Sequence, residues 1–185
     1  DSPNVTLVAA LAADMSLYAG DYRSSERTFE LLMQASGRAG RAEKAGEVVI
    51  QTYNPEEYSI QAVARQDAEY FYENELAFRR LMKYPPYSQM AAILILSEEE
   101  SEAKTLSEKL AENIHSLCGD AVTLIGPSKA GLSRAKDRYR YVLYVKSMNE
   151  EAMACVREIA EEANRRVANQ KTCSVQYDRD PVNGY

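Results

Sequence analysis

The sequence is poor in the residues that most often bind metal ions. Its 185 residues include one histidine, His115, and three cysteines, Cys118, Cys155 and Cys173. The cysteines are odd in number, too widely spaced for a zinc pattern, and include no Cys-x-x-Cys pair. His115 stands alone in a Glu-rich stretch, which favours an exposed structural histidine. We therefore expect no metal site in this chain, and reduced thiols typical of a cytoplasmic protein.

Long apolar runs are also lacking. No segment approaches the roughly 18 consecutive apolar residues of a membrane span, and no signal peptide opens the chain. A hydrophobic share of 45% with 27% charged residues is ordinary for a globular domain. The first residue is not Met, and a strand-like run starts almost at once, so we interpret the chain as a piece of a longer protein.

Positive charge is scarce overall but concentrated in one place. The net charge of −6 argues against a nonspecific polycation. Residues 98–120 carry seven acidic residues and two lysines, whereas residues 129–146 carry six basic residues and one acidic residue. Such asymmetry is informative about binding partners rather than about the fold.

The second half of the chain alternates strand-like and helix-like patterns. Apolar and β-branched runs predict strands at 90–96, 121–127, 138–146 and 173–178. Two helices are predicted from apolar steps of three and four residues, and they begin at apparent capping boxes, Ser97 with Glu100 and Ser147 with Glu150. The resulting order, β-α-β-β-α-β, is that of the ferredoxin-like plait.

Most of the basic residues fall in the connection between the second and third of these strands. The stretch "SKAGLSRAKDRYRY" interleaves bases with tyrosines, which suits a surface that grips phosphates and stacks bases. The alternative is a solvated loop that carries Lys and Arg for solubility, with the tyrosines in the core. The pattern leaves both open. The candidate DNA-binding residues are Lys129, Arg134, Lys136, Arg138, Tyr139 and Arg140.

The first half predicts part of a parallel α/β sheet. Strands are expected at 4–11 and 46–53, with a helix between them that Ser24 or Ser25 would cap. Two strands and one helix do not make a stable lobe, so we expect this lobe to be incomplete.

A long helix is predicted at 66–83 as the link to the plait. Its inward-facing residues are expected to be Phe71, Phe78, Leu81 and Met82. Pro85-Pro86 would end it, because proline does not continue a helix.

The stretch "QASGRAGR", residues 34–41, joins the first helix to the second strand. Gly37 and Gly40 can simply end the helix, where Arg38 and Arg41 would favour its negative C-terminal pole. In the functional interpretation the glycines keep the turn slim while the guanidinium groups reach phosphate oxygens in bidentate fashion. The full pattern Q-x-x-G-R-x-G-R is much more specific than a lone pair of arginines.

"QASGRAGR" resembles motif VI of the superfamily 2 helicases. The wider run "DYRSSERTFELLMQASGRAGRAEKAGEVVIQT" resembles one family closely, the primosomal replication-restart helicases (PriA, or primosomal protein N′). "ELAFRRLMKYPPY", "LIGPSKA", "RYRYVLYV" and "YDRDP" resemble the C-terminal region of that family in the same order. "DSPNV" resembles the tail of motif V, although the family would have an aromatic residue at Ser2, so no role is assigned there.

The resemblance implies an α/β chain of three parts. Residues 1–65 would end the second RecA-like helicase lobe, 66–83 would form a linking helix, and 84–185 would form the ferredoxin-like C-terminal domain. Arg41 and Arg38 would act as catalytic arginines in ATP hydrolysis, and Gln34, Gly37 and Gly40 would contact ATP.

The resemblance further implies an ATP-dependent 3′–5′ DNA helicase that restarts stalled replication forks and loads the primosome. ATP and Mg²⁺ would be bound mainly by the first lobe, and zinc only elsewhere in the full-length protein. Expected partners are forked or single-stranded DNA, the single-stranded-DNA-binding protein and other primosome proteins. A cytoplasmic monomer is expected.

A phosphate-binding G-x-x-x-x-G-K-[ST] loop and an acidic metal-binding box are absent from the chain. We therefore expect the chain alone to be inactive as an ATPase. The alternative function is a non-enzymatic ferredoxin-like module that binds RNA or protein, with "GRAGR" as a basic turn. A Walker loop upstream of Asp1 would favour the helicase, and a start codon there would exclude it.

Overall fold

The structure is a computed structural model that describes residues 5–18, 20–39, 46–135, 137–168, 172–182 and 184–185. The chain divides into two compact units, 1–81 and 82–185, which are described separately.

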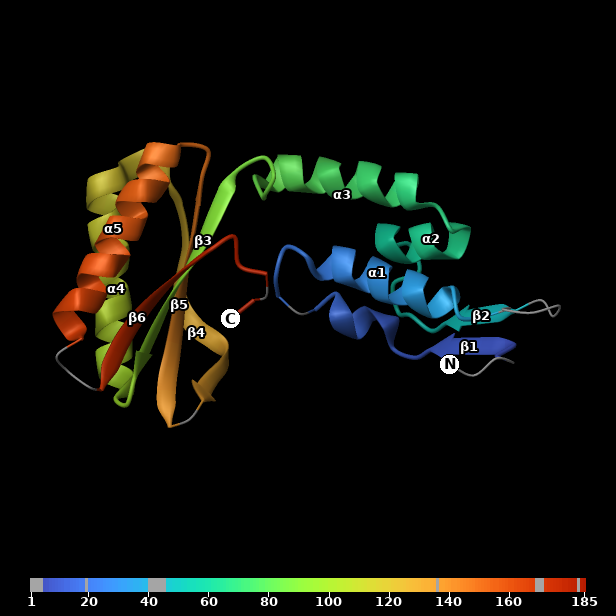
Figure 1. Cartoon of the computed structure of the whole chain (residues 1–185), viewed down its shortest axis with the longest axis horizontal. Helices are drawn as coiled ribbons and strands as arrows, with labels where there is room; N and C mark the ends of the chain where they lie inside the picture. Colours follow the sequence, from blue (N-terminus) through green and yellow to red (C-terminus); the bar gives the residue numbers. More distant parts are fainter. Residues whose placement is uncertain (1–4, 19, 40–45, 136, 169–171, 183) are drawn as a thin grey trace. The chain divides into compact units, whose positions relative to one another are not determined.

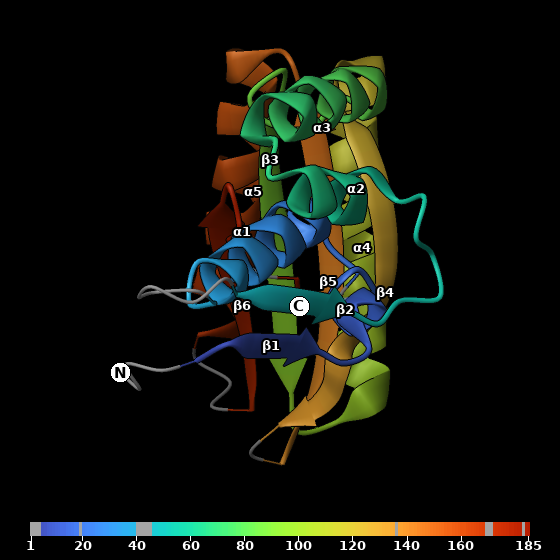
Figure 2. The ribbon, with the colours of Figure 1, turned by 90° about the vertical axis from the view of Figure 1, so that its right-hand side faces the viewer.

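The first unit contains a parallel strand–helix–strand arrangement. Strand β1 (Leu7–Ala10) pairs in parallel with β2 (Glu47–Ile50), and helix α1 (Ser24–Ser36) lies between them in sequence. Figure 2 shows the two strands side by side and pointing the same way. The parallel α/β order predicted for this half is confirmed, with strands shorter than the apolar runs. The first turn of α1 differs from the prediction, because Arg23 is its N-cap residue and makes no side-chain cap bond.

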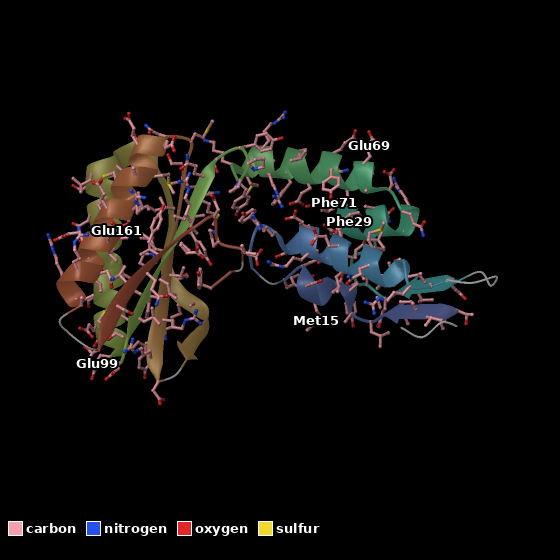
Figure 3. All side chains as sticks on the ribbon, viewed as in Figure 1. Met15, Phe29, Glu69, Phe71, Glu99 and Glu161 are labelled. Atoms are coloured by element: carbon pink, nitrogen blue, oxygen red, sulfur yellow. The ribbon has the colours of Figure 1, made fainter. Side chains whose placement is uncertain are left out.

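Two further helices complete the unit, α2 (Tyr58–Arg65) and α3 (Ala68–Met82). The sequence patterns did not predict α2, whose N-cap Glu57 accepts bonds from the N–H groups of Ser59 and Ile60. Phe29 of α1 stacks on Phe71 of α3 with ring centroids 4.1 Å apart, and both rings lie between these helices in Figure 3. This contact forms the centre of a small core that also holds Leu32, Ile60 and Val63.

The predicted inner face of α3 is wrong except for Phe71. Phe78, Leu81 and Met82 are 39%, 80% and 43% exposed, whereas Glu75 and Arg79 are buried. Phe71, Glu75 and Arg79 follow one another at steps of four, so they share one face of the helix. That face turns inward because each buried charge has an oppositely charged partner, as described below.

The second unit is a four-stranded antiparallel sheet covered by two helices on one face. Its strands are β3 (Gln89–Ser97), β4 (Thr123–Ala135), β5 (Arg138–Ser147) and β6 (Cys173–Arg179), in the spatial order β4-β5-β3-β6. Helices α4 (Glu100–Cys118) and α5 (Glu150–Val167) pack on the same side, as Figure 1 shows. This order is that of the ferredoxin-like plait, so the predicted β-α-β-β-α-β arrangement is confirmed.

Both faces of the sheet carry apolar clusters. The larger cluster lies under α4 and α5 and includes Ile93, Ile95, Leu143 and Val156. The smaller one lies on the opposite face, where Tyr185 packs beside Ala92, Leu94, Ala130 and Val142. Burial on both faces explains why "MAAILIL" is nearly continuous in apolar residues rather than alternating.

The predicted capping boxes are wrong. The N-cap residues of α4 and α5 are Glu99 and Asn149, and only Asn149 makes a side-chain cap, to the N–H groups of the second and third residues of α5. Ser97 and Ser147 are instead the last residues of β3 and β5. Each hydroxyl accepts a bond from the N–H two residues ahead, at 3.1 Å and 2.9 Å, a local turn that competes with a cap.

Gly126 occupies a bulge in β4, where a side chain has no room. Its φ is +98°, and an added Cβ would lie 2.9 Å from the carbonyl oxygen of Val142. We expect Gly126→Ala to lower the unfolding free energy of this unit by about 1–3 kcal/mol. Urea denaturation followed through the methyl NMR signals of Ile93 and Leu143 measures this. Gly131→Ala, whose Cβ would meet nothing closer than 3.5 Å, is the control, and an equal loss in both variants would contradict the argument.

Candidate functional sites

The predicted ATP-contact residues gather at the C-terminal end of α1. Gln34, Gly37 and Arg38 are all exposed there, and Gly40 and Arg41 lie outside the described residues. The helix continues into a tight turn, because the N–H groups of Arg38 and Ala39 bond to the carbonyls of Ala35 and Ser36, at 3.1 Å each. The guanidinium of Arg38 has no bonding partner among the residues that the structure describes. An unpaired, exposed guanidinium at this place is available to an anionic ligand.

Gly37 is not needed to end the helix. Its φ is −64°, in the right-handed region, and an added Cβ would meet only ordinary contacts, the nearest being the Met33 carbonyl oxygen at 3.5 Å. The prediction that the helix ends at this glycine is confirmed, because α1 ends at Ser36 and Gly37 is its C-cap, although the cap is right-handed. The prediction that it keeps the turn slim for a ligand stays a prediction.

A buried network that sequence reasoning missed anchors the start of α1 to α3. Arg79 donates to Glu75 at 2.6 Å and to Glu26, in the first turn of α1, at 2.9 Å. The Tyr58 hydroxyl donates to the other oxygen of Glu75 at 2.6 Å, and the Tyr22 ring lies 5.2 Å from the Arg79 guanidinium carbon. The spacing of Glu75 and Arg79 with Phe71 is the only sequence signal that pointed to it.

The charges in this network support one another. Burial alone would lower the pKa of Arg79, but its bonds to Glu26 and Glu75 outweigh burial and the net direction is upward. Burial also raises the pKa of Tyr58, and the bond to Glu75 adds to that effect. Arg79 thus stays charged and Tyr58 stays protonated, and their bonds to Glu75 and Glu26 fix the end of α1 opposite to Arg38.

The candidate DNA-binding residues do not form a loop. Most of the predicted connection belongs to β4, so Lys129 and Arg134 lie within a strand, paired with Tyr141 and Tyr139. Lys136 lies outside the described residues. The interpretation of this connection as a loop is wrong for residues 128–135, because β4 continues past its bulges to pair with the start of β5.

The alternation of β5 divides the remaining candidates between two faces. Tyr139 and Tyr141 pack against the larger core cluster under the helices. Successive residues of a strand point to opposite faces, so Arg138 and Arg140 belong to the other face, with Val142 and Tyr144. The structure therefore brings the two arginines together and separates them from Tyr139.

Lys129 has a local partner. Its ammonium lies 2.5 Å from a carboxylate oxygen of Glu100, in the first turn of α4. This hydrogen bond lowers the pKa of Glu100 and raises that of Lys129. The positive charge of Lys129 is therefore partly offset within the domain.

The face that carries the arginines also holds two tyrosines that the sequence analysis did not single out. The N–H of Tyr185 donates to the Tyr144 hydroxyl at 2.9 Å, and the Tyr185 hydroxyl donates to Asp178 at 2.6 Å. Burial and Asp178 raise the pKa of Tyr185 to about 12. Gly131 donates its N–H to the Tyr185 carbonyl at 2.8 Å, which ties the last residues to this face.

The first unit therefore carries an exposed arginine, Arg38, without a described partner, and the second carries a sheet face with two arginines and two tyrosines. A family model described as the primosomal protein N C-terminal domain matches residues 80–182. The chain belongs to this family. The resemblance identified from the sequence motifs is thereby confirmed, and the matched residues cover the whole plait.

Relatives of the primosomal protein N family match beyond the plait as well. The chain is 43% identical over 181 residues to the replication restart protein PriA of Bacillus subtilis, a match that covers 98% of this chain and 22% of the relative. It is 40% identical over 146 residues to the replication restart protein PriA of a Synechocystis species, covering 79% of this chain and 18% of the relative. The chain thus spans about a fifth of the length of these curated relatives.

The described residues show neither a metal-binding cluster nor a membrane-spanning helix. No group of three or more His, Cys, Asp or Glu side chains there is arranged to hold a metal ion. None of the described helices combines the length and the apolar character that crossing a membrane requires.

Proposed function

We propose that the chain ends the second RecA-like lobe and forms the C-terminal domain of an ATP-dependent 3′–5′ DNA helicase that restarts stalled replication forks. The observation that carries the proposal is the family match together with the exposed Gln34, Gly37 and Arg38 at the end of a helix between two parallel strands. Motif VI residues would need this placement to reach ATP on another lobe.

In this proposal the chain contributes charge rather than a complete site. Arg38 and Arg41 would stabilise the negative charge that develops on the transferring phosphoryl group, as arginine fingers do. Gln34, Gly37 and Gly40 would face ATP, whereas Mg²⁺ and most of ATP would be held by the first lobe. Zinc sites are proposed only for the rest of the full-length protein.

The chain alone is expected to show no ATP hydrolysis above the buffer rate, with or without DNA. The reason is that it lacks the phosphate-binding loop and the acidic metal-binding box. A phosphate-release assay with the 185-residue chain and the full-length protein side by side measures this. Turnover by the chain alone would contradict the assignment of roles.

The plait is proposed to bind forked or single-stranded DNA and primosome proteins, including the single-stranded-DNA-binding protein. The support is the basic and aromatic character of one sheet face, where Arg138, Arg140 and Tyr144 come from the same strand. DNA binding by the other candidates that the sequence indicated stays a prediction; these are Lys129, Arg134, Lys136 and Tyr139. A cytoplasmic monomer is proposed for the whole protein.

Replacing Arg138 and Arg140 with Gln is expected to flatten the salt dependence of single-stranded DNA binding. Each neutralised phosphate contributes about −0.7 to the slope of log K against log salt, so the double variant should lose about 1.4. Lys104→Gln is the control, since Lys104 is an exposed lysine on α4, outside the predicted DNA-binding set, and lies 3.8 Å from Glu108. Fluorescence anisotropy at several salt concentrations measures the slope, and an unchanged slope in the double variant would remove this face from the DNA interface.

A further inference from the structure

A small pocket opens at the end of the plait that lies opposite to the β4–β5 turn. It has a volume of 160 Å³, and its lining includes Lys83, Thr123 and Lys146. About five water molecules occupy such a volume in the liquid, so a tetrahedral oxyanion fits inside. Neither Lys83 nor Thr123 nor Lys146 belongs to the sets of site residues described above.

Lys146 is an unusual lysine because its side chain is buried. The residue is 9% exposed, and its ammonium donates to the carbonyl oxygen of Met82 at 2.9 Å. The ammonium also lies 4.2 Å from the centre of the Tyr84 ring. Within the part of the chain that the structure describes, no carboxylate lies within ion-pair distance of it. A carbonyl and a ring offset only part of the cost of burying a full charge.

A second cation lies close to the first. Lys83 is exposed and lines the same pocket, and its ammonium has no partner among the described residues. Burial lowers the pKa of Lys146, and the charge of Lys83 lowers it further. Two ammonium groups that repel each other in one pocket would both be stabilised by an anion placed between them.

The polar groups around the lysines leave one donor unused. Ser88 donates its hydroxyl to the Lys83 carbonyl, and Ser147 donates to the Ala121 carbonyl, each at 2.6 Å. The Thr123 hydroxyl has no partner among the described residues and remains available as a donor. Asp120 is the single carboxylate of the described lining; it is exposed and lies beyond ion-pair distance of either lysine. The net charge of the pocket is therefore positive.

We propose that this pocket binds a phosphate oxyanion between Lys83 and Lys146, with Thr123 as the hydroxyl donor. The phosphate comes either from a nucleic-acid backbone or from free inorganic phosphate. The backbone source rests on the proposed DNA-binding function. Arg140 and Lys146 share one face of β5 and are six residues apart, about 20 Å along the β-strand. Single-stranded DNA lying along this face would therefore meet both residues.

Titration of the 185-residue chain with inorganic phosphate at constant ionic strength tests the pocket itself. The backbone amide NMR signals of Thr123 and Ser147 are expected to shift saturably, and chloride at the same ionic strength is expected to leave them in place. Lys83→Gln should weaken binding about tenfold or more, because a charge-assisted hydrogen bond is lost. Thr123→Val should also weaken phosphate binding. This second variant makes the test independent of the Lys83 substitution.

Lys104→Gln is the matched control, since Lys104 is an exposed lysine of the same unit, on α4, and lies 3.8 Å from Glu108. This variant should bind phosphate as the parent does. Equal shifts with chloride, an equal loss in the control, or full phosphate binding by Lys83→Gln would each overturn the proposal.

Single-stranded DNA distinguishes the two sources of phosphate. If the backbone occupies the pocket, Lys83→Gln should reduce the magnitude of the salt slope by about 0.7, one phosphate. If the chain binds inorganic phosphate and the slope is unchanged, the pocket is supported as a site for free phosphate, and the backbone source is excluded. A third outcome is also decisive. If replacing Arg138 and Arg140 changes the salt slope of DNA binding, but inorganic phosphate never shifts the amide signals of Thr123 and Ser147, the DNA-binding function holds and the pocket proposal fails.

Discussion

Replacing Arg41 with Ala in the full-length protein is expected to reduce ATP turnover about a thousandfold or more, the range typical of arginine fingers. Arg41 lies outside the described residues, three positions after Arg38. Folding and DNA affinity should stay nearly intact, because the predicted contact is made to the transferring phosphoryl group. Steady-state ATP hydrolysis at saturating ATP and DNA is the measurement, with DNA affinity determined separately.

Two further variants make this result specific. Arg38→Lys should also be harmful, since lysine keeps the charge but lacks the planar fork that holds two phosphate oxygens. Arg65→Ala removes an exposed arginine of the same unit whose contacts are local, to Gln61 and Tyr70, and should leave turnover unchanged. Normal turnover by Arg41→Ala would refute its catalytic role.

Replacing Arg79 with Met is expected to cost the first unit about 3–5 kcal/mol, the usual loss when one partner of a buried ion pair is removed. Glu75, which is 3% exposed, would then be left buried without a cation beside it. Hydrogen exchange of the α1 and α3 amides should accelerate by the factor that corresponds to this loss of free energy. The loss is bounded by the full unfolding free energy of the unit. Amides of β3 and β5 should be unaffected and serve as an internal reference.

The neighbouring arginine provides the control for this second result. Arg80 is exposed, and Arg80→Met should change protection by no more than about 0.5 kcal/mol. Glu75→Gln combined with Arg79→Met should recover part of the loss, because the more deeply buried carboxylate, Glu75, is then replaced by a neutral amide and only the partly exposed Glu26 loses its partner. If Arg79→Met behaves like Arg80→Met, the network is not what holds α1 against α3.

The plait could be predicted because its signals are local. Each strand is a run of β-branched and aromatic residues, and each helix repeats apolar residues every three or four positions, so order and type follow directly. The true extent of β4 could not be predicted. Gly126, Pro127 and Gly131 look like loop residues, yet bulges accommodate them while pairing continues to Ala135.

The first unit was harder to predict because tertiary contacts decide it. Helix α2 has only 8 residues, too few to be stable by propensity alone, and it exists because Ile60, Ala62 and Val63 pack into the core. The inward face of α3 was missed because apolar residues were assumed to face inward. Glu75 and Arg79 do so instead because Glu26 and Tyr58, distant in sequence, satisfy them.

The candidate sites also divide into one that local sequence reveals and others that depend on tertiary contacts. The motif around Gln34 and Arg38 is continuous in sequence, so its residues could be named without a structure. The basic residues of the plait were grouped by proximity along the chain, whereas strand alternation assigns Tyr139 and Arg140 to opposite faces. The lysine pocket brings together residues 63 positions apart in sequence, Lys83 and Lys146, and no local pattern reveals it.

The central position of β3 has a consequence for the order in which the protein is made and folded. One neighbour of β3 is β6, and their register joins Ala91 to Arg179, 88 residues later in the chain. Closing such distant pairs is slow, because chain entropy is lost before the contacts form. During synthesis β3 leaves the ribosome long before β6 exists, and until then one edge of a highly apolar strand remains unpaired. The plait therefore completes its sheet only after β6 has been synthesised, and until that stage a nascent chain would most need protection from aggregation.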